Sequence, residues 1–334
     1  MPSADPSRTL NFAFLGCGAV TRRHSRTLKR LDDGVQRFYA SRGAAKAREF
    51  NRSLRGSGAF GSYEEALRDE KIDVVLVATP PVSHLDLTLQ ALDAGKHVIV
   101  EKPPFLRAAD FDLVERAQQR TGRRVMVAEN YFYKPIAERI RQIVASGAIG
   151  EVRILSVNAL KEQRLEGWRE REDLAGGGAL FEGGIHWVNF MANLGLPVLS
   201  AHGYRPGGGS GPDRSMVAVF EYAQGAVGTL YHSWETKSPL KGLRLSRIFG
   251  SHGSITFESN GLFLLLYGVR RRMYFPRPRD LLGFQAMFRD FLGALRTGEE
   301  PRFDLARARR DLELIEEIYQ SLDRTSNLQS EGAR

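Results

Sequence analysis

The chain has 334 residues, of which 42% are hydrophobic and 26% are charged, and its formal net charge is +9. This composition is typical of a folded globular protein and excludes a disordered one, and the length fits two domains better than one. The single cysteine, Cys17, excludes an internal disulfide framework and a cysteine-based zinc cage, which indicates a reducing, cytoplasmic location. No apolar run approaches the ~18 residues of a membrane span, and residues 1–8 lack the apolar core of a signal peptide. We therefore expect no membrane partner.

The excess of basic residues raises the question of nucleic-acid binding. Basic and acidic residues are interleaved along most of the chain, and the densest basic run, Arg270 to Arg272, belongs to no recognisable nucleic-acid module. Excess charge by itself favours solubility and non-specific attraction. The distribution predicts a solvated surface and no nucleic-acid partner.

The first part of the chain, after a tail at 1–10, alternates short apolar runs with amphipathic stretches. The apolar runs predict strands, and the amphipathic stretches predict helices that cover them. Strands are expected at 11–15, 35–40, 72–78, 97–100 and 125–128, and helices at 20–31, 44–54, 85–94 and 108–121. Alternating elements of this kind form a parallel sheet with right-handed crossovers. We therefore predict an α/β domain over 11–128.

The pattern changes over 129–334, where period-two alternation and short turns predict a largely antiparallel sheet and an α+β domain. A flexible, glycine-rich loop is expected at 207–212. Strands are expected at 151–160, 216–222, 226–234, 243–249, 254–257, 262–267 and 271–275, and helices at 135–146, 179–194, 284–296 and 305–322.

A glycine-rich turn directly follows the first predicted strand. Gly16 allows a tight turn there, and Gly18 lets the backbone approach a pyrophosphate, which the free N–H groups of the next helix then bind. Thr21 occupies the position where the dinucleotide-binding pattern has its third glycine. The strand–turn–helix context still predicts a Rossmann dinucleotide-binding domain.

The end of the second strand indicates which dinucleotide is bound. A carboxylate at this place would bind the ribose hydroxyls of NAD. The chain has Ser41 and Arg42 there, with Lys46 one helical turn further on, and these side chains suit a phosphate dianion. The pattern favours NADP over NAD, unless Arg42 and Lys46 are merely solvated.

Two more turns lie at the same edge of the predicted sheet, where open α/β folds bind ligands. Thr79 and Pro80 follow the third strand, and Glu101 and Lys102 follow the fourth. A lysine at this edge could share a proton with a substrate hydroxyl, or it could be an ordinary surface lysine. In the second domain, Glu182 and His186 are four residues apart and are expected on one face of a helix, although such a pair is common by chance.

Several segments of the chain carry a specific combination of motifs. They are GCGAVTRRH at 16–24, ATPPVSH at 78–84, AGKHVIVEKP at 94–103, GEV at 150–152, and Trp168-Arg169 followed by GGGALFEGGIH at 176–186. Together they resemble the glucose-fructose oxidoreductase, inositol dehydrogenase and rhizopine-catabolism family, the Gfo/Idh/MocA family of NAD(P)-dependent sugar and cyclitol oxidoreductases. The resemblance covers nearly the whole chain.

The resemblance implies that Lys102 and His186 complete the active site, with Glu182 where the family has an aspartate. Glu182 would orient His186, accept a hydrogen bond from a substrate hydroxyl, or pair with Arg169. No metal site is expected. The predicted cofactor contacts are Gly16, Cys17, Gly18, Ala19, Val20, Ser41, Arg42, Lys46, Thr79, Pro80, His84, Glu101, Lys102, Asn130, Trp168 and Arg169.

The family also implies an open sheet in the second domain that meets a partner subunit. Apolar residues such as Leu230, Leu243 and Phe249 are expected on that sheet face, which predicts a homodimer or homotetramer.

The sequence thus predicts an NADP-dependent oxidoreductase that transfers a hydride between nicotinamide and a hydroxyl or keto carbon of a sugar, sugar derivative or cyclitol. His186 is the expected general base, and Lys102 is expected to hydrogen-bond the reacting oxygen. Two alternatives stay open. One is a glycosidase that retains its NAD(P) and works by transient oxidation and elimination, and the other is a non-catalytic cofactor-binding regulator.

Overall fold

The structure, a computed structural model, describes residues 9–31, 34–164, 167, 171, 174, 176–207, 211–237 and 242–331. The chain divides into two compact units, Met1–Glu129 with Phe284–Ala308, and Asn130–Gly283 with Arg309–Arg334. The sequence prediction had assigned 284–308 to the second domain. The segment belongs to the first unit because α9 (Phe284–Thr297) packs on α1 (Ala19–Leu31), where the rings of Phe284 and Phe288 contact His24 edge-on.

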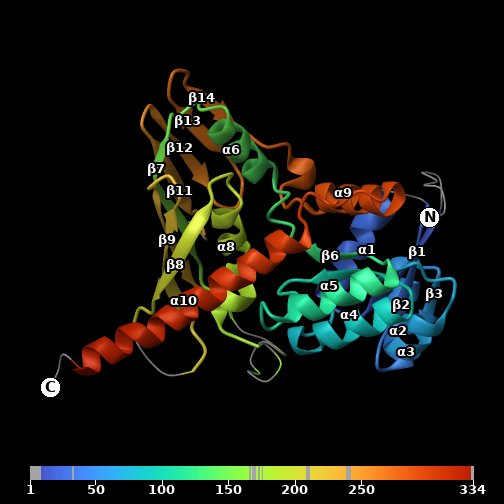
Figure 1. Cartoon of the computed structure of the whole chain (residues 1–334). Coiled ribbons are helices and arrows are strands. Elements are labelled where there is room, and N and C mark those ends of the chain that lie inside the picture. The colour runs from blue at the N-terminus through green and yellow to red at the C-terminus, as the bar shows by residue number, and fades with distance from the viewer. Residues whose placement is uncertain are drawn as a thin grey trace. The chain divides into compact units, whose positions relative to one another are not determined.

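The first unit is built on a six-stranded parallel sheet in the order β3-β2-β1-β4-β5-β6 (Figure 1). Chain order reverses between β1 and β4, and such a switch point is where open α/β sheets bind ligands at their carboxyl edge. The predicted Rossmann α/β domain is therefore confirmed. The strands are β1 (Leu10–Leu15), β2 (Val35–Ala40), β3 (Gly58–Phe60), β4 (Val74–Val77), β5 (His97–Glu101) and β6 (Val125–Ala128), and the remaining helices are α2 (Ala44–Leu54), α3 (Tyr63–Arg68), η1 (Pro81–Ser83), α4 (His84–Asp93) and α5 (Asp110–Thr121).

The second unit is built on an eight-stranded sheet in the order β14-β13-β12-β11-β7-β10-β9-β8. All its neighbouring strands are antiparallel except β7 and β10, which confirms the largely antiparallel prediction. Its strands are β7 (Val152–Leu160), β8 (Val198–Tyr204), β9 (Ser215–Tyr222), β10 (Val227–Ser233), β11 (Leu245–Gly250), β12 (Gly253–Glu258), β13 (Leu264–Tyr267) and β14 (Arg272–Tyr274), and its helices are α6 (Pro135–Ala145), η3 (Leu180–Gly184), α8 (Ile185–Ala192), η5 (Pro278–Asp280) and α10 (Leu305–Glu331).

Helices cover one face of this sheet and one of its edges. α6 and α8 lie on the same face (Figure 1). α10 follows the β8 edge, where Ser321 accepts a hydrogen bond from the backbone of Gly203 at 2.7 Å and Glu317 accepts one from Ala201 at 3.2 Å. No helix of the described residues covers the other face. Of the predicted loop at 207–212, residues 208–210 lie outside the described residues.

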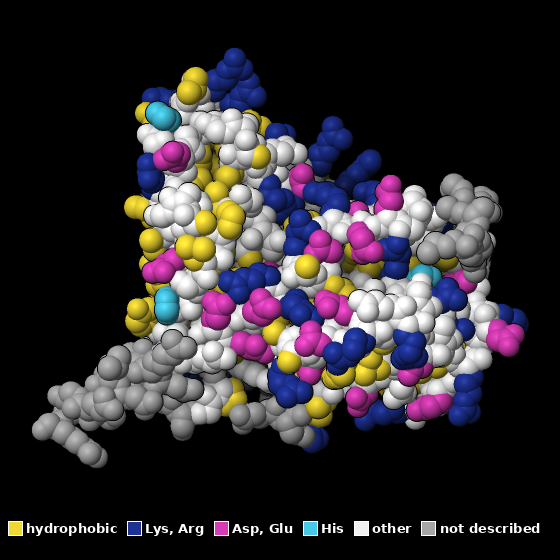
Figure 2. Space-filling model, viewed as in Figure 1, with side chains coloured by type: hydrophobic (Ala, Val, Ile, Leu, Met, Phe, Trp, Pro, Cys, Tyr) yellow, Lys and Arg dark blue, Asp and Glu magenta, His cyan; other side chains and the backbone are white. Residues whose placement is uncertain are grey.

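The uncovered face carries a row of apolar side chains that the strand register brings together. Val227 on β10 and Phe249 on β11 both pair with Ile154 on the central strand β7, and all three side chains are exposed. Hydrophobic side chains gather along this side of the sheet in Figure 2. Of the residues predicted for this face only Phe249 is exposed. Leu230 is fully buried, because strand alternation turns it toward the helices, and Leu243, which precedes β11, is only partly exposed.

Candidate functional site

The glycine-rich turn joins β1 to α1 and has the geometry that a dinucleotide requires. Gly16 has a φ of +109°, and a Cβ there would lie 2.5 Å from the carbonyl oxygen of Ala78, so only glycine fits. A Cβ on Gly18 would meet no atom within 4 Å, which leaves open space beside the backbone for a pyrophosphate. Thr21 replaces the third glycine and donates a hydrogen bond from Oγ1 to the Gly16 carbonyl at 2.7 Å. The turn therefore fits a dinucleotide, and the threonine fastens the start of the helix to it.

The predicted ribose end of the site lies after β2. Ser41 is buried, and Arg42 and Lys46 are exposed. Burial raises the pKa of the Cys17 thiol to about 11, and the positive charges of Lys46 and Arg22 oppose this rise, so both cations lie near the glycine turn. No described carboxylate ends β2, and the Glu49 carboxylate nearby is paired with Arg22 at 3.5 Å.

Tyr63, at the start of α3, also belongs to this region, although the sequence analysis did not identify it. Burial raises the pKa of its hydroxyl, and the positive charge of Arg42 opposes the rise while Cys17 adds to it. Tyr63 therefore lies within electrostatic reach of both Arg42 and the glycine turn. Nothing in the local sequence marks this residue, because its place near Arg42 and Cys17 depends on how the short helix α3 packs in the folded unit.

The two proline-containing turns are fastened to each other by His84. Its Nδ1 lies 2.9 Å from the Pro103 carbonyl oxygen and its Nε2 lies 2.8 Å from that of Thr79. Burial lowers the pKa of His84, although the two carbonyl oxygens oppose that shift. Both ring nitrogens thus face backbone, so the structure supports His84 as a brace beneath the predicted cofactor site.

Lys102 follows β5 at the same edge, and its backbone is hydrogen-bonded to the buried carboxylate of Glu101. Its N–H donates to Glu101 Oε2 at 3.2 Å, and Glu101 Oε1 is hydrogen-bonded to His24 Nε2 of α1. Burial raises the pKa of Glu101, but His24, Lys102 and His84 together hold it below the ordinary value. The carboxylate is therefore charged, and it anchors the lysine turn to the first helix.

In the second unit, Glu182 and His186 lie on a continuous helical segment that begins as a π-helix. Residues Leu180–Gly184 form the π-helical turn and α8 continues from Ile185. Glu182 is buried and His186 is partly exposed. Short π-helical segments are uncommon and recur at functional sites. The sequence predicts one regular helix over 179–194, so the π-helical turn is a departure from that prediction.

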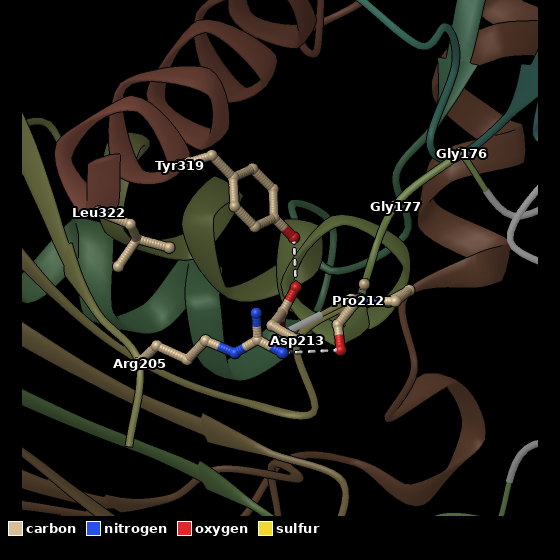
Figure 3. Close-up of a pocket in the computed structure, with 9 residues that line it drawn as sticks. Gly176, Gly177, Arg205, Pro212, Asp213, Tyr319 and Leu322 are labelled. Carbon is tan, nitrogen blue, oxygen red and sulfur yellow. Dashed lines mark hydrogen bonds between the residues drawn. The ribbon is translucent and has the colours of Figure 1, made fainter. Parts of the chain in front are cut away.

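The start of this segment is held by Asp213. Its Oδ2 accepts a hydrogen bond from the Leu180 N–H at 2.9 Å, and its Oδ1 accepts one from the Tyr319 hydroxyl at 2.6 Å. A Cβ on Gly178 would lie 1.9 Å from Asp213 Oδ1, so the glycine lets the chain pass close to the carboxylate. A cavity of about 380 Å³ lies beside these groups, and Arg205 in its lining donates a hydrogen bond to the Pro212 carbonyl at 3.2 Å. Figure 3 shows how these residues are arranged.

Several side chains that the sequence analysis did not identify surround His186. The ring of Tyr131 stacks on its imidazole with centroids 4.1 Å apart and planes 9° apart. His232, on β10 beneath the segment, is 2% exposed, and burial lowers its pKa to about 3, so it is neutral in the physiological range. Lys161 and Arg244 also contribute positive charge to this region. Ring stacking between residues so far apart in sequence leaves no local pattern.

The other predicted contacts are placed as follows. Asn130 is buried in the second unit and donates from Nδ2 to the Leu282 carbonyl at 2.6 Å. Ala19 is exposed at the start of α1 and Val20 is partly exposed. Trp168 and Arg169 lie outside the described residues. Within the described part of the chain, no group of three or more potential metal ligands occurs, and no helix is long and apolar enough to span a membrane.

Comparison with known proteins gives matches to both units. Residues 10–129 match the model of an oxidoreductase family with an NAD-binding Rossmann fold, and residues 137–256 match that of the GFO/IDH/MocA C-terminal domain. A D-xylose 1-dehydrogenase (NADP(+)) of Haloferax volcanii is 28% identical over 85% of this chain and 88% of its own. A dTDP-3,4-didehydro-2,6-dideoxy-alpha-D-glucose 3-reductase of Streptomyces violaceoruber is 36% identical over 46% of this chain and 45% of its own.

The chain thus spans about half the length of the first curated relatives that it matches. Among solved structures, levoglucosan dehydrogenase in complex with NADH and levoglucosan has a TM-score of 0.83 at 21% identity, with 94% of this chain and 97% of that chain covered. At this identity the likeness shows a shared fold. Together with the two matched domain models, the fold shows that the chain belongs to the GFO/IDH/MocA oxidoreductase family.

Proposed function

We propose that this chain is an NADP-dependent oxidoreductase that transfers a hydride between nicotinamide and a hydroxyl or keto carbon of a sugar, sugar derivative or cyclitol. The observation that carries the proposal is the meeting of three features at the carboxyl edge of one parallel sheet. They are the glycine turn after β1, the Ser41–Lys46 segment after β2, and Lys102 after β5. The names of the relatives, which act on sugars and their derivatives, support the substrate class.

The preference for NADP rests on the charges after β2. Ser41, Arg42 and Lys46 offer a hydroxyl and two cations to the extra phosphate, and no described carboxylate at the strand end would repel it. The Haloferax relative is named for NADP, whereas the levoglucosan dehydrogenase structure holds NADH. From the charges after β2 we expect this chain to bind NADP more tightly than NAD.

The proposed chemistry divides between two side chains. His186 accepts the proton of the reacting hydroxyl, and Lys102 donates a hydrogen bond to the same oxygen and stabilises its developing negative charge. In the reducing direction the same groups return the proton. When bound, the nicotinamide supplies the hydride chemistry that no side chain provides. Glu182 accepts a hydrogen bond from a neighbouring substrate hydroxyl in our proposal, and orientation of His186 is its alternative role.

We also propose that the uncovered face of the second sheet binds a second copy of this chain, giving a dimer or tetramer. The exposed row at Ile154, Val227 and Phe249 spans three neighbouring strands, and Tyr267 on β13 continues it through Ser254. Contiguous exposed apolar patches are typical of protein–protein interfaces, which supports the proposal.

A panel of sugars, cyclitols and their keto forms, assayed for a change in NADP(H) absorbance, tests the activity. We expect net oxidation or reduction of the cofactor with at least one compound. With glycosides added to the panel, release of an aglycone without net cofactor turnover would favour the glycosidase alternative. Tight NADP(H) binding without any turnover across the panel would favour the regulatory alternative.

A further inference from the structure

The ring of Tyr131 lies between His186 and the ammonium group of Lys134. The imidazole of His186 is parallel to it at 4.1 Å, and Lys134 Nζ lies 4.3 Å from the same centroid. Because the imidazole covers one face of the phenol ring at stacking distance, the ammonium must lie over the other face. The three groups therefore form a stack in the order Lys134, Tyr131, His186.

The stack is fixed at its far end. Lys134 is 3% exposed, and its Nζ donates to the Ser259 carbonyl at 3.2 Å. The ring of Trp187 lies 5.8 Å from the same ammonium and meets Tyr131 edge-on at 5.4 Å. The position of the charge behind Tyr131 is thus set by a hydrogen bond and two aromatic rings, and it does not depend on solvent.

We propose that Lys134, acting through the ring of Tyr131, keeps His186 in its neutral, proton-accepting form and fixes the plane of its imidazole. Lys134 and Tyr131 are positioning residues in this account. The inference rests on the proposed role of His186 as general base, and it adds the device that sets the pH at which this base becomes available.

The physical reason is electrostatic. A cation over one face of an aromatic ring draws the π electrons toward itself, so the opposite face attracts an imidazolium less than it otherwise would. The two charges would also repel each other directly across roughly 8 Å, which corresponds to a shift of about one pH unit at the dielectric constants that describe protein sites. Both effects favour the neutral imidazole.

Other charged groups around His186 act in both directions. At the neighbouring His232, the Glu182 carboxylate raises the pKa, the charges of Lys161 and Arg244 lower it, and burial keeps His232 itself neutral. Three further carboxylates on neighbouring elements are engaged elsewhere. Asp213 binds Leu180 and Tyr319, Asp311 binds Asn189, and Glu258 binds Asn260.

The direct test is an NMR titration of the His186 ring in the full-length protein, with its signal assigned by its loss in His186→Ala. Lys134→Met keeps the length of the side chain and removes its charge, and we expect the titration midpoint of His186 to rise by about one pH unit. Lys134→Arg keeps the charge and is expected to keep the midpoint. Lys96→Met is the matched control, because Lys96 is also buried and also donates to a backbone carbonyl, that of Asp69 at 2.8 Å.

The same variants are then compared in turnover once a substrate is known. The acidic limb of kcat/KM should move upward with the NMR midpoint in Lys134→Met, and Tyr131→Phe should retain the wild-type profile because it retains the ring. Tyr131→Leu should lose kcat at least about tenfold, with little change in KM, because the imidazole plane is no longer fixed.

An unchanged or lowered midpoint in Lys134→Met would overturn the inference, and Lys134→Gln gives the same decision if the methionine variant does not fold. Because the titration needs no substrate, it stands apart from the proposed function. If the midpoint rises in Lys134→Met but the protein shows no turnover, the role of the stack is supported and the proposed enzymatic function is rejected. If turnover is found and the midpoint does not move, the function is supported and the role of the stack is rejected.

Discussion

Among the groups after β2, we expect Arg42 to contribute most to the preference for NADP. Arg42 is exposed after β2, beside the buried Ser41, in the place where an NAD-binding fold would hold a carboxylate. We expect Arg42→Asp to weaken NADP binding at least about tenfold, because a charge-assisted hydrogen bond contributes roughly 1.5–3 kcal/mol, and to leave NAD binding much less affected. Titration of each cofactor by fluorescence or calorimetry measures this. Equal or tighter NAD binding by the unmodified protein would reject the NADP assignment.

We expect the buried His232 to make the folded protein sensitive to acid. Burial lowers its pKa from the ordinary 6.5 to about 3, so between these values the unfolded chain binds a proton that the folded chain does not. The stabilisation of the folded state that comes from keeping His232 unprotonated is fully present above pH 6.5. It is lost as the pH falls toward the folded-state pKa, by up to ~1.4 kcal/mol per pH unit. We expect His232→Leu to flatten the fall in melting temperature between neutral pH and pH ~5.

The control for this measurement is His202→Leu, because His202 is an exposed histidine on β8. That variant should keep the acid sensitivity of the wild type. If the melting temperature of His232→Leu falls with decreasing pH as steeply as that of the wild type, groups other than His232 govern the acid sensitivity.

At the scale of elements, Asp213 ties the π-helical turn to α10. It accepts from Leu180 N–H and from the Tyr319 hydroxyl, so Asp213→Ala leaves both donors without this acceptor. We expect the free energy of unfolding to fall by about 1–2 kcal/mol. Turnover should fall as well, because Glu182 follows directly in the loosened turn, while NADP affinity should be unchanged. Tyr319→Phe keeps the cap and should have a smaller effect. Full turnover in Asp213→Ala would show that the turn holds its shape without the cap.

Elements with strong periodicity could be predicted from the sequence, and weakly marked ones could not. The helices α1 and α2 and the strands β1 and β2 begin and end within a residue of their predicted bounds. β3 and α3 were missed because they are very short, and β8 (Val198–Tyr204) was missed because Ser200, His202 and Gly203 break its apolar pattern.

The candidate site divides in the same way. The glycine turn and Lys102 follow strands, so their places at the sheet edge could be derived from the sequence. The contacts of His24 with Glu101 and of Tyr131 with His186 depend on tertiary packing between residues more than 50 positions apart, which no local pattern encodes. An uncovered sheet face with apolar residues was predicted, but Leu230 was assigned to it wrongly. Alternation along a strand shows which residues share a face, and it does not show which of the two faces the helices cover.

At the scale of the molecule, the uncovered sheet predicts self-association. We expect light scattering at micromolar concentration to give the mass of a dimer or tetramer, and Ile154→Glu to shift it toward the monomer, because the change introduces a charge in the middle of the apolar row. Leu113→Glu, a change at an exposed apolar residue of the first unit, is the control and should keep the assembly. A strictly monomeric wild type would contradict the proposed interface.

Our central expectation is that Lys102 and His186 act on the substrate oxygen and do not bind the pyrophosphate of the cofactor. It is tested most directly by steady-state turnover and NADP affinity of Lys102→Ala and His186→Ala, measured side by side with the best substrate from the panel. We expect each variant to lose about 10²–10⁴-fold in turnover while NADP affinity stays nearly that of the wild type. Wild-type turnover in either variant would contradict the role assigned to that residue.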